Sequence, residues 1–171
     1  MRIFLLFLTF SAIAFSDIKR QVNGPITEPK LLSAGAGIFN IVRNEKMLDL
    51  QLEYRSCYAF YKNKFLFFRP LFGVMATSKF SAYVYSGVAF DIFFAKSIVF
   101  TPSFAPGIYF RGKGMDLGFP LEFRSSVELA YRFNNKSRLG AMFYHLSNAS
   151  LSSHNPGTEC LVFFYAFPLN K

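Results

Sequence analysis

The chain has 171 residues, is 52% hydrophobic and 19% aromatic, and contains 24 Phe but no Trp. Its length predicts a single domain. So much phenylalanine is unusual in a soluble domain of this size but typical of a β-barrel whose outer wall faces lipid. The formal net charge is +9. Because no helix-turn-helix, zinc or basic-repeat pattern accompanies this charge, we expect no nucleic-acid partner.

The first 16 residues predict a secretory signal peptide. They have a basic start, a short apolar run over residues 3–10 and a small-residue ending, Ala-Phe-Ser, at 14–16. The apolar run is shorter than the roughly 20 residues that a spanning helix needs. We therefore expect residues 1–16 to be removed and residues 17–171 to form the mature domain; an uncleaved interfacial anchor is the alternative.

Apolar and polar residues alternate along the remaining chain in strand fashion. The pattern is clearest over residues 121–133, where Leu, Phe, Val and Tyr on one face alternate with Glu, Arg and Ser on the other. Such alternation over about 9–13 residues predicts an all-β fold: an eight-stranded antiparallel transmembrane β-barrel of the outer-membrane type. The predicted strands are 33–42, 46–55, 64–76, 80–93, 98–110, 121–133, 137–147 and 158–167.

A set of charged side chains shares the polar face of these strands. The interior of an eight-stranded barrel is filled by side chains. We therefore expect a buried ion-pair network there rather than catalytic carboxylates. Its predicted members are Asp49, Glu53, Arg55, Glu122, Arg124, Glu128 and Arg132.

The two cysteines, Cys57 and Cys160, are predicted to remain free thiols. The strand assignment places them at opposite ends of the barrel, and bridged Cα atoms lie within roughly 7 Å of one another. No histidine neighbours Cys57 in the sequence, and Cys160 faces away from Glu159. Neither thiol is therefore a candidate nucleophile.

Three side-chain types of an acyl-hydrolase triad gather at the last predicted hairpin. His145 and Ser147 end one strand, and Glu159 opens the next. Residues i and i+2 share a face with Cα atoms roughly 6.5–7 Å apart, and the returning strand lies about 5 Å away. The face that these residues share is otherwise apolar, which places the trio on the lipid-facing wall. An ionisable group in that position is a functional-site hypothesis by default.

Strand parity predicts which end of the barrel carries these residues. If both chain ends are periplasmic, the loop at residues 148–157 faces outward, so the site lies near the outer leaflet. The short turns near residues 62, 96 and 134–135 then face the periplasm, as is usual for such barrels.

The same hairpin resembles a known family. The pattern His-x-Ser-Asn from His145, followed by Asn-Pro-Gly-x-Glu ending at Glu159, is similar to that of the lipid A 3-O-deacylases of the PagL type. These are outer-membrane barrels that cut an ester-linked acyl chain from lipid A. The resemblance is strongest over residues 123–167. It implies a serine esterase that needs no cofactor and no metal.

The resemblance also implies a role for each residue. Ser147 would attack the ester, His145 would act as general base and then acid, and Glu159 would orient the imidazole. Asn148 or Asn155, with nearby backbone N–H groups, would stabilise the oxyanion. Phe123 matches an aromatic of the family; it would line the acyl groove or belong to the aromatic girdle.

The implied partners are lipid A, as lipopolysaccharide in the outer leaflet, and the Gram-negative outer membrane itself, with a homodimer left open. Phosphorylated lipid A would also suit the net positive charge. A metal site of His145, His154 and Glu159 is disfavoured, because no strand fixes His154. Two other functions remain alternatives: a small structural or adhesive barrel, and a lipid A acyltransferase.

Overall fold

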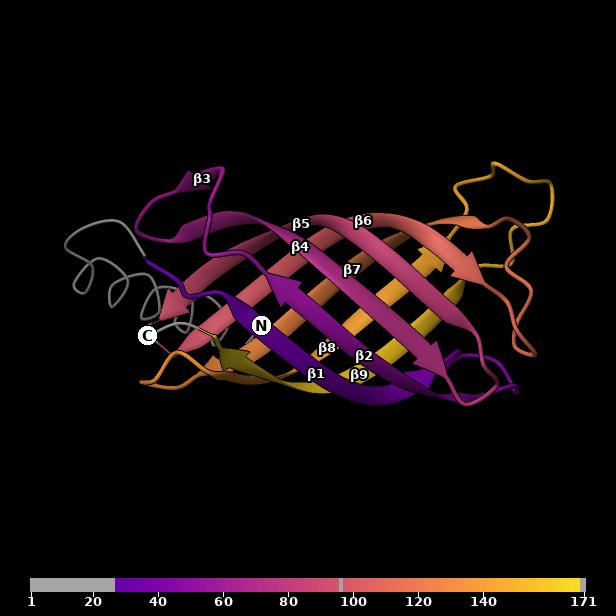
Figure 1. Ribbon diagram of the computed structural model, residues 1–171, viewed down its shortest axis with the longest axis horizontal. Coiled ribbons are helices and arrows are strands. Elements are labelled where there is room, and N and C mark those ends of the chain that lie inside the picture. The colour runs from indigo at the N-terminus through magenta and orange to yellow at the C-terminus, as the bar shows by residue number, and fades with distance from the viewer. Residues whose placement is uncertain (1–26, 96, 170–171) are drawn as a thin grey trace, which may run out of the picture.

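The computed structural model describes residues 27–95 and 97–169, so the predicted signal peptide lies outside the described residues. Figure 1 shows a cylinder of tilted strands with loops at its two ends. Within the described ranges, no helix is long and apolar enough to cross a membrane. The strands are β1 (Leu31–Phe39), β2 (Met47–Arg55), β3 (Tyr61–Lys62), β4 (Leu66–Thr77), β5 (Ala82–Ala95), β6 (Ile98–Phe110), β7 (Leu121–Arg132), β8 (Arg138–Ser147) and β9 (Thr158–Pro168).

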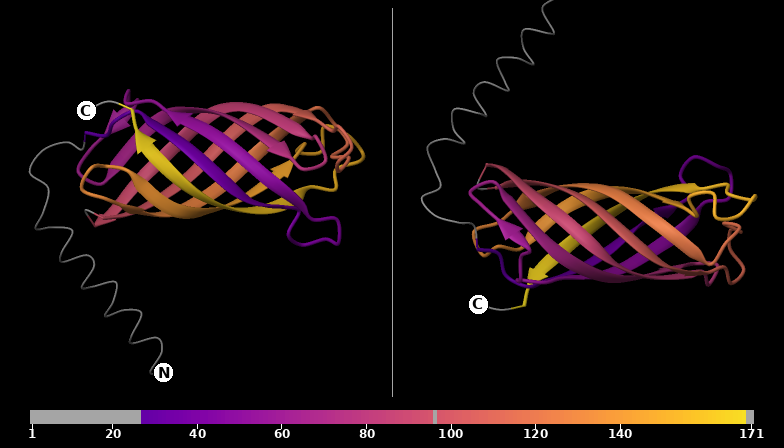
Figure 2. Two further views of the ribbon diagram at one scale, coloured as in Figure 1. Left: turned by 60° about the horizontal axis from the view of Figure 1, so that its bottom comes forward. Right: turned by 90° about the horizontal axis from the view of Figure 1, so that it is seen from above.

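Antiparallel pairing closes the sheet into a barrel. Neighbouring long strands pair in chain order, β1 pairs with β9, and β2 pairs with β4. The short β3 adds two residues of pairing beside the start of β4. Figure 2 shows the same closed cylinder from two further sides. The predicted eight-stranded antiparallel barrel is thus confirmed, and closure leaves the long strands without an open sheet edge.

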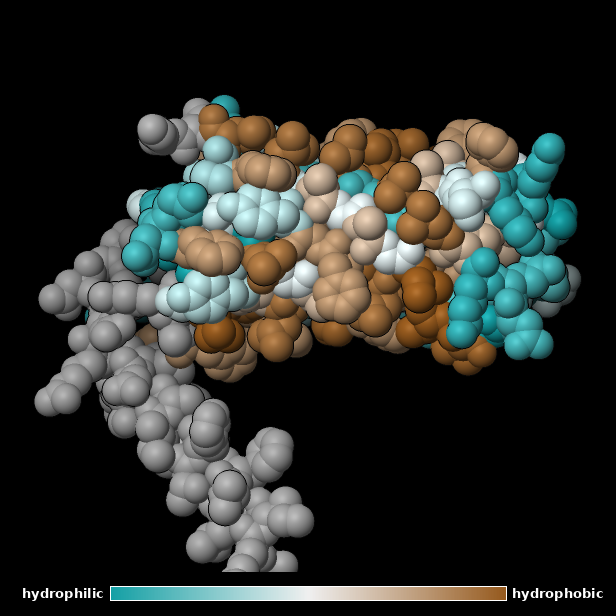
Figure 3. Space-filling view, turned by 90° about the horizontal axis from the view of Figure 1, so that it is seen from below, coloured by the Kyte–Doolittle hydropathy of each residue, from teal (hydrophilic) through white to brown (hydrophobic). Residues whose placement is uncertain are grey.

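Alternation along each strand separates the interior from the outer wall. In β2, the exposed fractions of Leu48, Leu50 and Leu52 are 50–51%, whereas Asp49 between them is fully buried. Successive side chains of a strand point to opposite faces, so one register fixes both surfaces. Figure 3 shows the apolar residues as a band along the cylinder, with hydrophilic residues gathered at its right-hand end. A membrane barrel presents this kind of surface to hydrocarbon.

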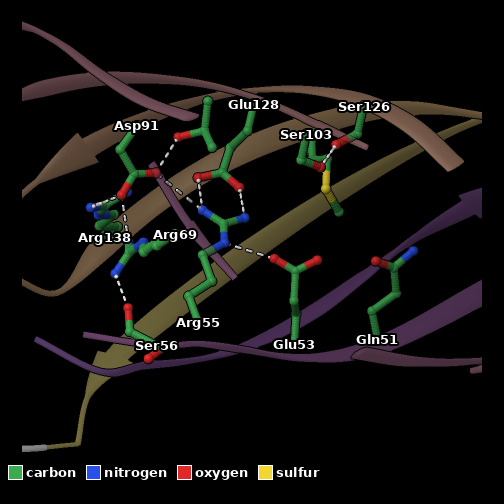
Figure 4. Close-up of polar contacts among 12 residues, drawn as sticks. Gln51, Glu53, Arg55, Ser56, Arg69, Asp91, Ser103, Ser126, Glu128 and Arg138 are labelled. Atoms are coloured by element: carbon green, nitrogen blue, oxygen red, sulfur yellow. Dashed lines mark hydrogen bonds and ion pairs between the residues drawn. The ribbon is translucent and has the colours of Figure 1, made fainter. Parts of the chain in front are cut away.

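An ion-pair network lies in the interior, as the sequence predicted (Figure 4). Its predicted member Asp49 instead accepts hydrogen bonds from Gln51 and Tyr144 and forms no ion pair with a described residue. Arg55 Nε contacts Glu53 at 2.7 Å, and its Nη2 pairs with Glu128. Nearby, Asp91 contacts Arg138 at 2.9 Å. The side chains in these ion pairs are at most 5% exposed. Removing one member of such a group strands an unpaired buried charge, so the network makes the interior arrangement specific.

Two other interior carboxylates depart from the expected pattern. Glu28, which precedes β1, accepts hydrogen bonds from Arg132 and Arg138 at 2.8 Å and so ties the lead-in segment into the barrel mouth. Glu122 is fully buried as predicted, but neither of its carboxylate oxygens has a hydrogen-bond partner among the described residues. Alternation predicted which face each carboxylate lies on, but it did not predict which arginines each carboxylate contacts.

Strand boundaries differ from the prediction mainly at β1 and β3. β1 ends at Phe39, three residues before the predicted position 42, because Asn40 adopts a left-handed φ of 61° that ends the extended conformation. The predicted turn over residues 56–63 contains β3. A strand of two residues is too short to show an alternating pattern in the sequence. Aromatic packing accompanies this pairing, with the rings of Phe60 and Phe68 5.2 Å apart.

Both cysteines are free, which confirms that prediction. Cys160 is buried and pairs with Phe39, at the end of the barrel that carries loop 148–157. Cys57 is exposed and follows the opposite end of β2.

Candidate active site

His145 on β8 and Glu159 on β9 form a contact across the last hairpin. The two residues are direct cross-strand partners. His145 Nδ1 lies 3.2 Å from Glu159 Oε1, and the two side chains are 41% and 32% exposed. Their neighbours Tyr144, Leu146 and Cys160 are at most 1% exposed. The imidazole and carboxylate therefore lie on the outer wall, as the alternation predicted, while adjacent side chains fill the interior.

Ser147 is the last residue of β8 and shares the outer face with His145. It is partly exposed and pairs across the sheet with Phe123 of β7. The i, i+2 spacing places the two side chains on the same face of the strand. Among the described residues, no hydrogen bond yet joins Ser147 Oγ to the ring. Hydrogen bonds between catalytic groups are often long without substrate and tighten when the substrate binds.

Gly157 lies against the other edge of the imidazole. It is buried and has a left-handed φ of 60°, a conformation that glycine adopts without steric cost. A Cβ at this position would lie 2.9 Å from His145 Cε1 and 3.4 Å from Nε2. The turn before β9 can therefore approach the ring only because residue 157 has no side chain. This contact was not predicted, although the Pro-Gly dipeptide indicated a turn.

Asn148 joins the two long loops at this end of the barrel. The residue is fully buried, and its Nδ2 donates to the backbone oxygens of Leu117 at 2.9 Å and His154 at 3.0 Å. Its backbone N–H donates to Asn155 Oδ1 at 3.1 Å. Both amide N–H groups of Asn148 are thus engaged in holding loops 111–120 and 148–157 together. The Nδ2 of Asn155 has no partner among the described residues, and that residue is partly exposed.

Loop 40–46, between β1 and β2, covers the opposite flank of the site. Ile41 N–H donates to Glu159 O at 2.9 Å, which extends the β1–β9 pairing past the carboxylate. Arg43 Nη2 donates to Pro156 O at 2.5 Å. Nothing in the sequence pattern of this turn linked it to a hairpin more than a hundred residues away.

Apolar side chains line the outer wall next to Ser147. The rings of Phe123 and Phe104 stack with centroids 6.0 Å apart and an interplanar angle of 14°. Beyond them, a hollow of about 550 Å³ lies between the end of β6 and the loop that follows, lined by residues 108–112 and 116–120. Phe123 thus lies directly across from Ser147 on the outer wall.

The remaining histidine takes no part in a cluster. The His154 side chain is exposed, and its backbone oxygen accepts from Asn148. Within residues 27–95 and 97–169, no group of three or more His, Cys, Asp or Glu side chains is arranged to hold a metal ion.

The fold and this site define a class of protein. It is a closed, eight-stranded barrel with an apolar outer wall. That wall carries a histidine–carboxylate pair, and a serine lies two residues after the histidine on the same face. The family model of the lipid A 3-O-deacylases (PagL) matches residues 42–168. The chain therefore belongs to this family of lipid A deacylases, and it is a hydrolase of that class.

A solved structure agrees on the fold. The crystal structure of the outer membrane enzyme PagL superposes with a TM-score of 0.67 at 19% identity, over 81% of this chain and 99% of that one. The outer membrane protein Ail of Yersinia pestis, solved in a phospholipid bilayer nanodisc, gives a TM-score of 0.47 at 13% identity, over 82% of this chain and 100% of that one. The second likeness is too low to carry an argument. No curated protein matches the sequence.

Proposed function

We propose that the chain is a serine esterase that hydrolyses the 3-hydroxyacyl ester at position 3 of lipid A. Ser147, His145 and Glu159 act as its catalytic triad, and the loop end of the barrel faces the outer leaflet. The observation that carries this proposal is the His145–Glu159 contact on the outer wall. Ionisable side chains on a lipid-facing surface cost free energy, so a pair that is found there is by default a candidate functional site.

The reaction begins with attack of Ser147 Oγ on the ester carbonyl carbon. His145 Nε2 takes the hydroxyl proton as the new C–O bond forms. Glu159, 3.2 Å from Nδ1, keeps the proton of the ring on that nitrogen and stabilises the imidazolium. Collapse of the tetrahedral intermediate breaks the bond to the sugar oxygen, which receives the proton from Nε2. The products of this half-reaction are a deacylated sugar and an acyl-serine.

Water completes the cycle by the same route. His145 removes a proton from a water molecule that attacks the acyl-serine carbonyl. The returning proton goes to Ser147 Oγ, and the free 3-hydroxy fatty acid leaves. Each step is balanced by substrate, water and the three side chains. The proposal therefore needs neither a cofactor nor a metal.

Asn155 is the better of the two candidate oxyanion donors. The N–H groups of Asn148 already donate to two carbonyl oxygens, whereas the Nδ2 of Asn155 has no partner among the described residues. The contact between Asn155 Oδ1 and the Asn148 N–H holds the Asn155 side chain beside Asn148 and leaves its Nδ2 available as a donor. A single donor of this kind contributes about 10²–10³ to the rate.

The outer-wall location suits a substrate that never leaves the membrane. The acyl chains of lipid A lie in hydrocarbon, and its ester groups lie at the boundary with the sugar. Phe123 and Phe104 provide an apolar surface beside Ser147 on which the leaving acyl chain can pack. The ester thus reaches the triad by lateral diffusion within the leaflet.

The mass of lipid A tests the proposal. The protein is produced in a heterologous Gram-negative outer membrane whose lipid A carries the 3-hydroxyacyl chain at position 3, and lipid A is measured by mass spectrometry. Wild type and His154→Ala, which alters an exposed loop histidine, should both remove one hydroxyacyl chain. Folded Ser147→Ala should leave lipid A intact, and undiminished loss in that variant would refute the serine mechanism.

The same spectrum separates the two alternatives. A lipid A mass that is unchanged by folded wild-type protein would identify a non-catalytic barrel. A gain of one acyl chain would identify an acyltransferase.

A further inference from the structure

Arg43 is held at the turn that borders the catalytic histidine. Its Nη2 donates to the backbone oxygen of Pro156, a residue 113 positions away. Pro156 precedes Gly157, which lies against the His145 ring. Loop 40–46 and the turn before β9 therefore meet at the loop end of the barrel, beside the site. The guanidinium is fixed there by the fold rather than free to sweep over the surface.

The charge of Arg43 is not neutralised by the protein. A guanidinium has five N–H donors, and the contact with Pro156 O occupies one of them. Among the described residues, no carboxylate lies within ion-pair distance of this side chain. Two other cations at the same end do have acidic partners, since Lys79 pairs with Glu45 and Arg111 with Asp116. Arg43 is thus an exposed cation, held in place by one hydrogen bond, whose other N–H groups can donate to a ligand.

The most suitable ligand for such a group is a phosphate. The planar fork of arginine matches two oxygens of one phosphate or carboxylate group, which a lysine ammonium does not. Arg43 belongs to loop 40–46, at the end of the barrel that carries loop 148–157. Figure 3 shows hydrophilic residues at the right-hand end of the apolar band. A lipid whose chains lie in hydrocarbon carries its phosphates at the boundary with water, close to the loops at this end of the barrel.

We propose that Arg43 binds a phosphate of the sugar headgroup of the substrate and thereby positions the ester over Ser147. The inference rests on the proposed function. Phe123 contacts the acyl chain on one side of the nucleophile, and Arg43 holds the anionic headgroup on the other. Two attachment points fix the carbonyl between them. Arg43 is therefore a specificity-determining residue, which selects phosphorylated lipids over neutral ones.

Binding and hydrolysis are measured separately, with two substrates. Binding of folded Ser147→Ala protein to lipid A in detergent micelles is compared with binding to lipid A from which the phosphates have been removed. The same pair of substrates is used for steady-state hydrolysis by the enzyme with Ser147 intact. Each measurement is repeated with Arg43→Met, with Arg43→Lys and with the control Lys79→Met, which removes one cation from the β4–β5 turn.

Phosphate removal should weaken binding and raise KM by about ten- to a hundredfold in the protein with Arg43, the range for a charge-assisted hydrogen-bonded contact. Arg43→Met should abolish this preference and leave kcat on the dephosphorylated lipid within about twofold. Arg43→Lys should retain part of the preference, because it keeps the charge without the fork. Lys79→Met should show the same preference for the phosphorylated lipid, in binding and in KM, as the protein with Lys79.

Equal loss on both lipids in Arg43→Met would overturn the inference, because it would show that Arg43 only braces the turn at Pro156. An equal loss of preference in Lys79→Met would also overturn it, since general surface charge would then suffice. The binding measurement does not depend on chemistry. If it shows the Arg43-dependent preference while wild type hydrolyses neither lipid, Arg43 binds the headgroup phosphate, and what fails is the proposed function together with the positioning of the ester.

Discussion

Replacement of Gly157 by alanine should displace the imidazole of His145, the proposed general base. The added Cβ would lie 2.9 Å from His145 Cε1, whereas carbon atoms in contact are about 3.5–4.0 Å apart. The imidazole must therefore retreat by roughly 0.6–1 Å. Because Nδ1 is already 3.2 Å from Glu159 Oε1, a retreat of this size breaks the contact or turns the ring away from Ser147.

We expect the Gly157→Ala variant to lose about 10²-fold in kcat, the typical cost of a misplacement of about 1 Å. Its stability should fall by only about 1–2 kcal/mol, the cost of a left-handed conformation in a residue with a side chain. The barrel should remain folded, since native proteins have roughly 5–15 kcal/mol to lose. The assay is release of hydroxy fatty acid from lipid A, with unfolding in detergent monitored by circular dichroism.

Gly112→Ala is the matched control. Gly112 also has a positive φ, 55°, but a Cβ there would meet the backbone oxygen of Phe80 and not the imidazole. This variant should lose at least as much stability as Gly157→Ala and keep much more activity. Wild-type kcat in folded Gly157→Ala would refute the reasoning, because it would show that the turn does not constrain His145.

Three further predictions concern the triad, the oxyanion donor and the interior network. Glu159→Gln should lower kcat by about 10²–10⁴ with little change in KM, because a neutral amide neither fixes the tautomer of the imidazole nor stabilises the imidazolium. A variant with the kcat and the pH–rate profile of the wild type would count against a role for this carboxylate. Asn155→Ala should lose about 10²–10³ in kcat. Asn148→Ala, which removes the donor to the carbonyl oxygens of Leu117 and His154, should instead lose about 1–3 kcal/mol of stability. The reverse pattern in paired kinetic and thermal measurements would exchange their roles. Asp91→Asn should cost about 3–5 kcal/mol, because Asp91 is the one acidic partner of buried Arg69 among the described residues. Asp116→Asn, which removes an exposed partner of Arg111, should cost about 0–1 kcal/mol. Equal shifts of the denaturation midpoint would contradict this account of the interior.

Much of the fold was predictable because a membrane barrel repeats one local rule. Lipid outside and packed side chains inside force period-two alternation on every long strand. β6 was predicted with its observed bounds, and β7 and β8 to within one residue at each end. The two-residue β3 escaped prediction because it is shorter than the period that would reveal it.

The His145–Glu159 contact was predictable for a similar reason. A hairpin brings its own two strands together, so the spacing between His145 and Glu159 carried enough information to place them opposite one another. Contacts between loops of different hairpins had no such signal. The Arg43–Pro156 and Asn148–Leu117 hydrogen bonds depend on barrel closure and loop conformation, which no local pattern encodes.

The central claim is that Ser147 is a nucleophile activated on the lipid-facing wall. The most direct test uses a lipophilic phosphonofluoridate, a reagent that forms a covalent bond with activated serine hydroxyls. After the reaction, the masses of the intact protein and of its peptides are measured by mass spectrometry. We predict a single adduct on Ser147, complete loss of lipid A hydrolysis, and no adduct in the folded His145→Ala variant. Full inactivation with Ser147 unmodified, or an adduct that forms as fast without His145, would contradict the account.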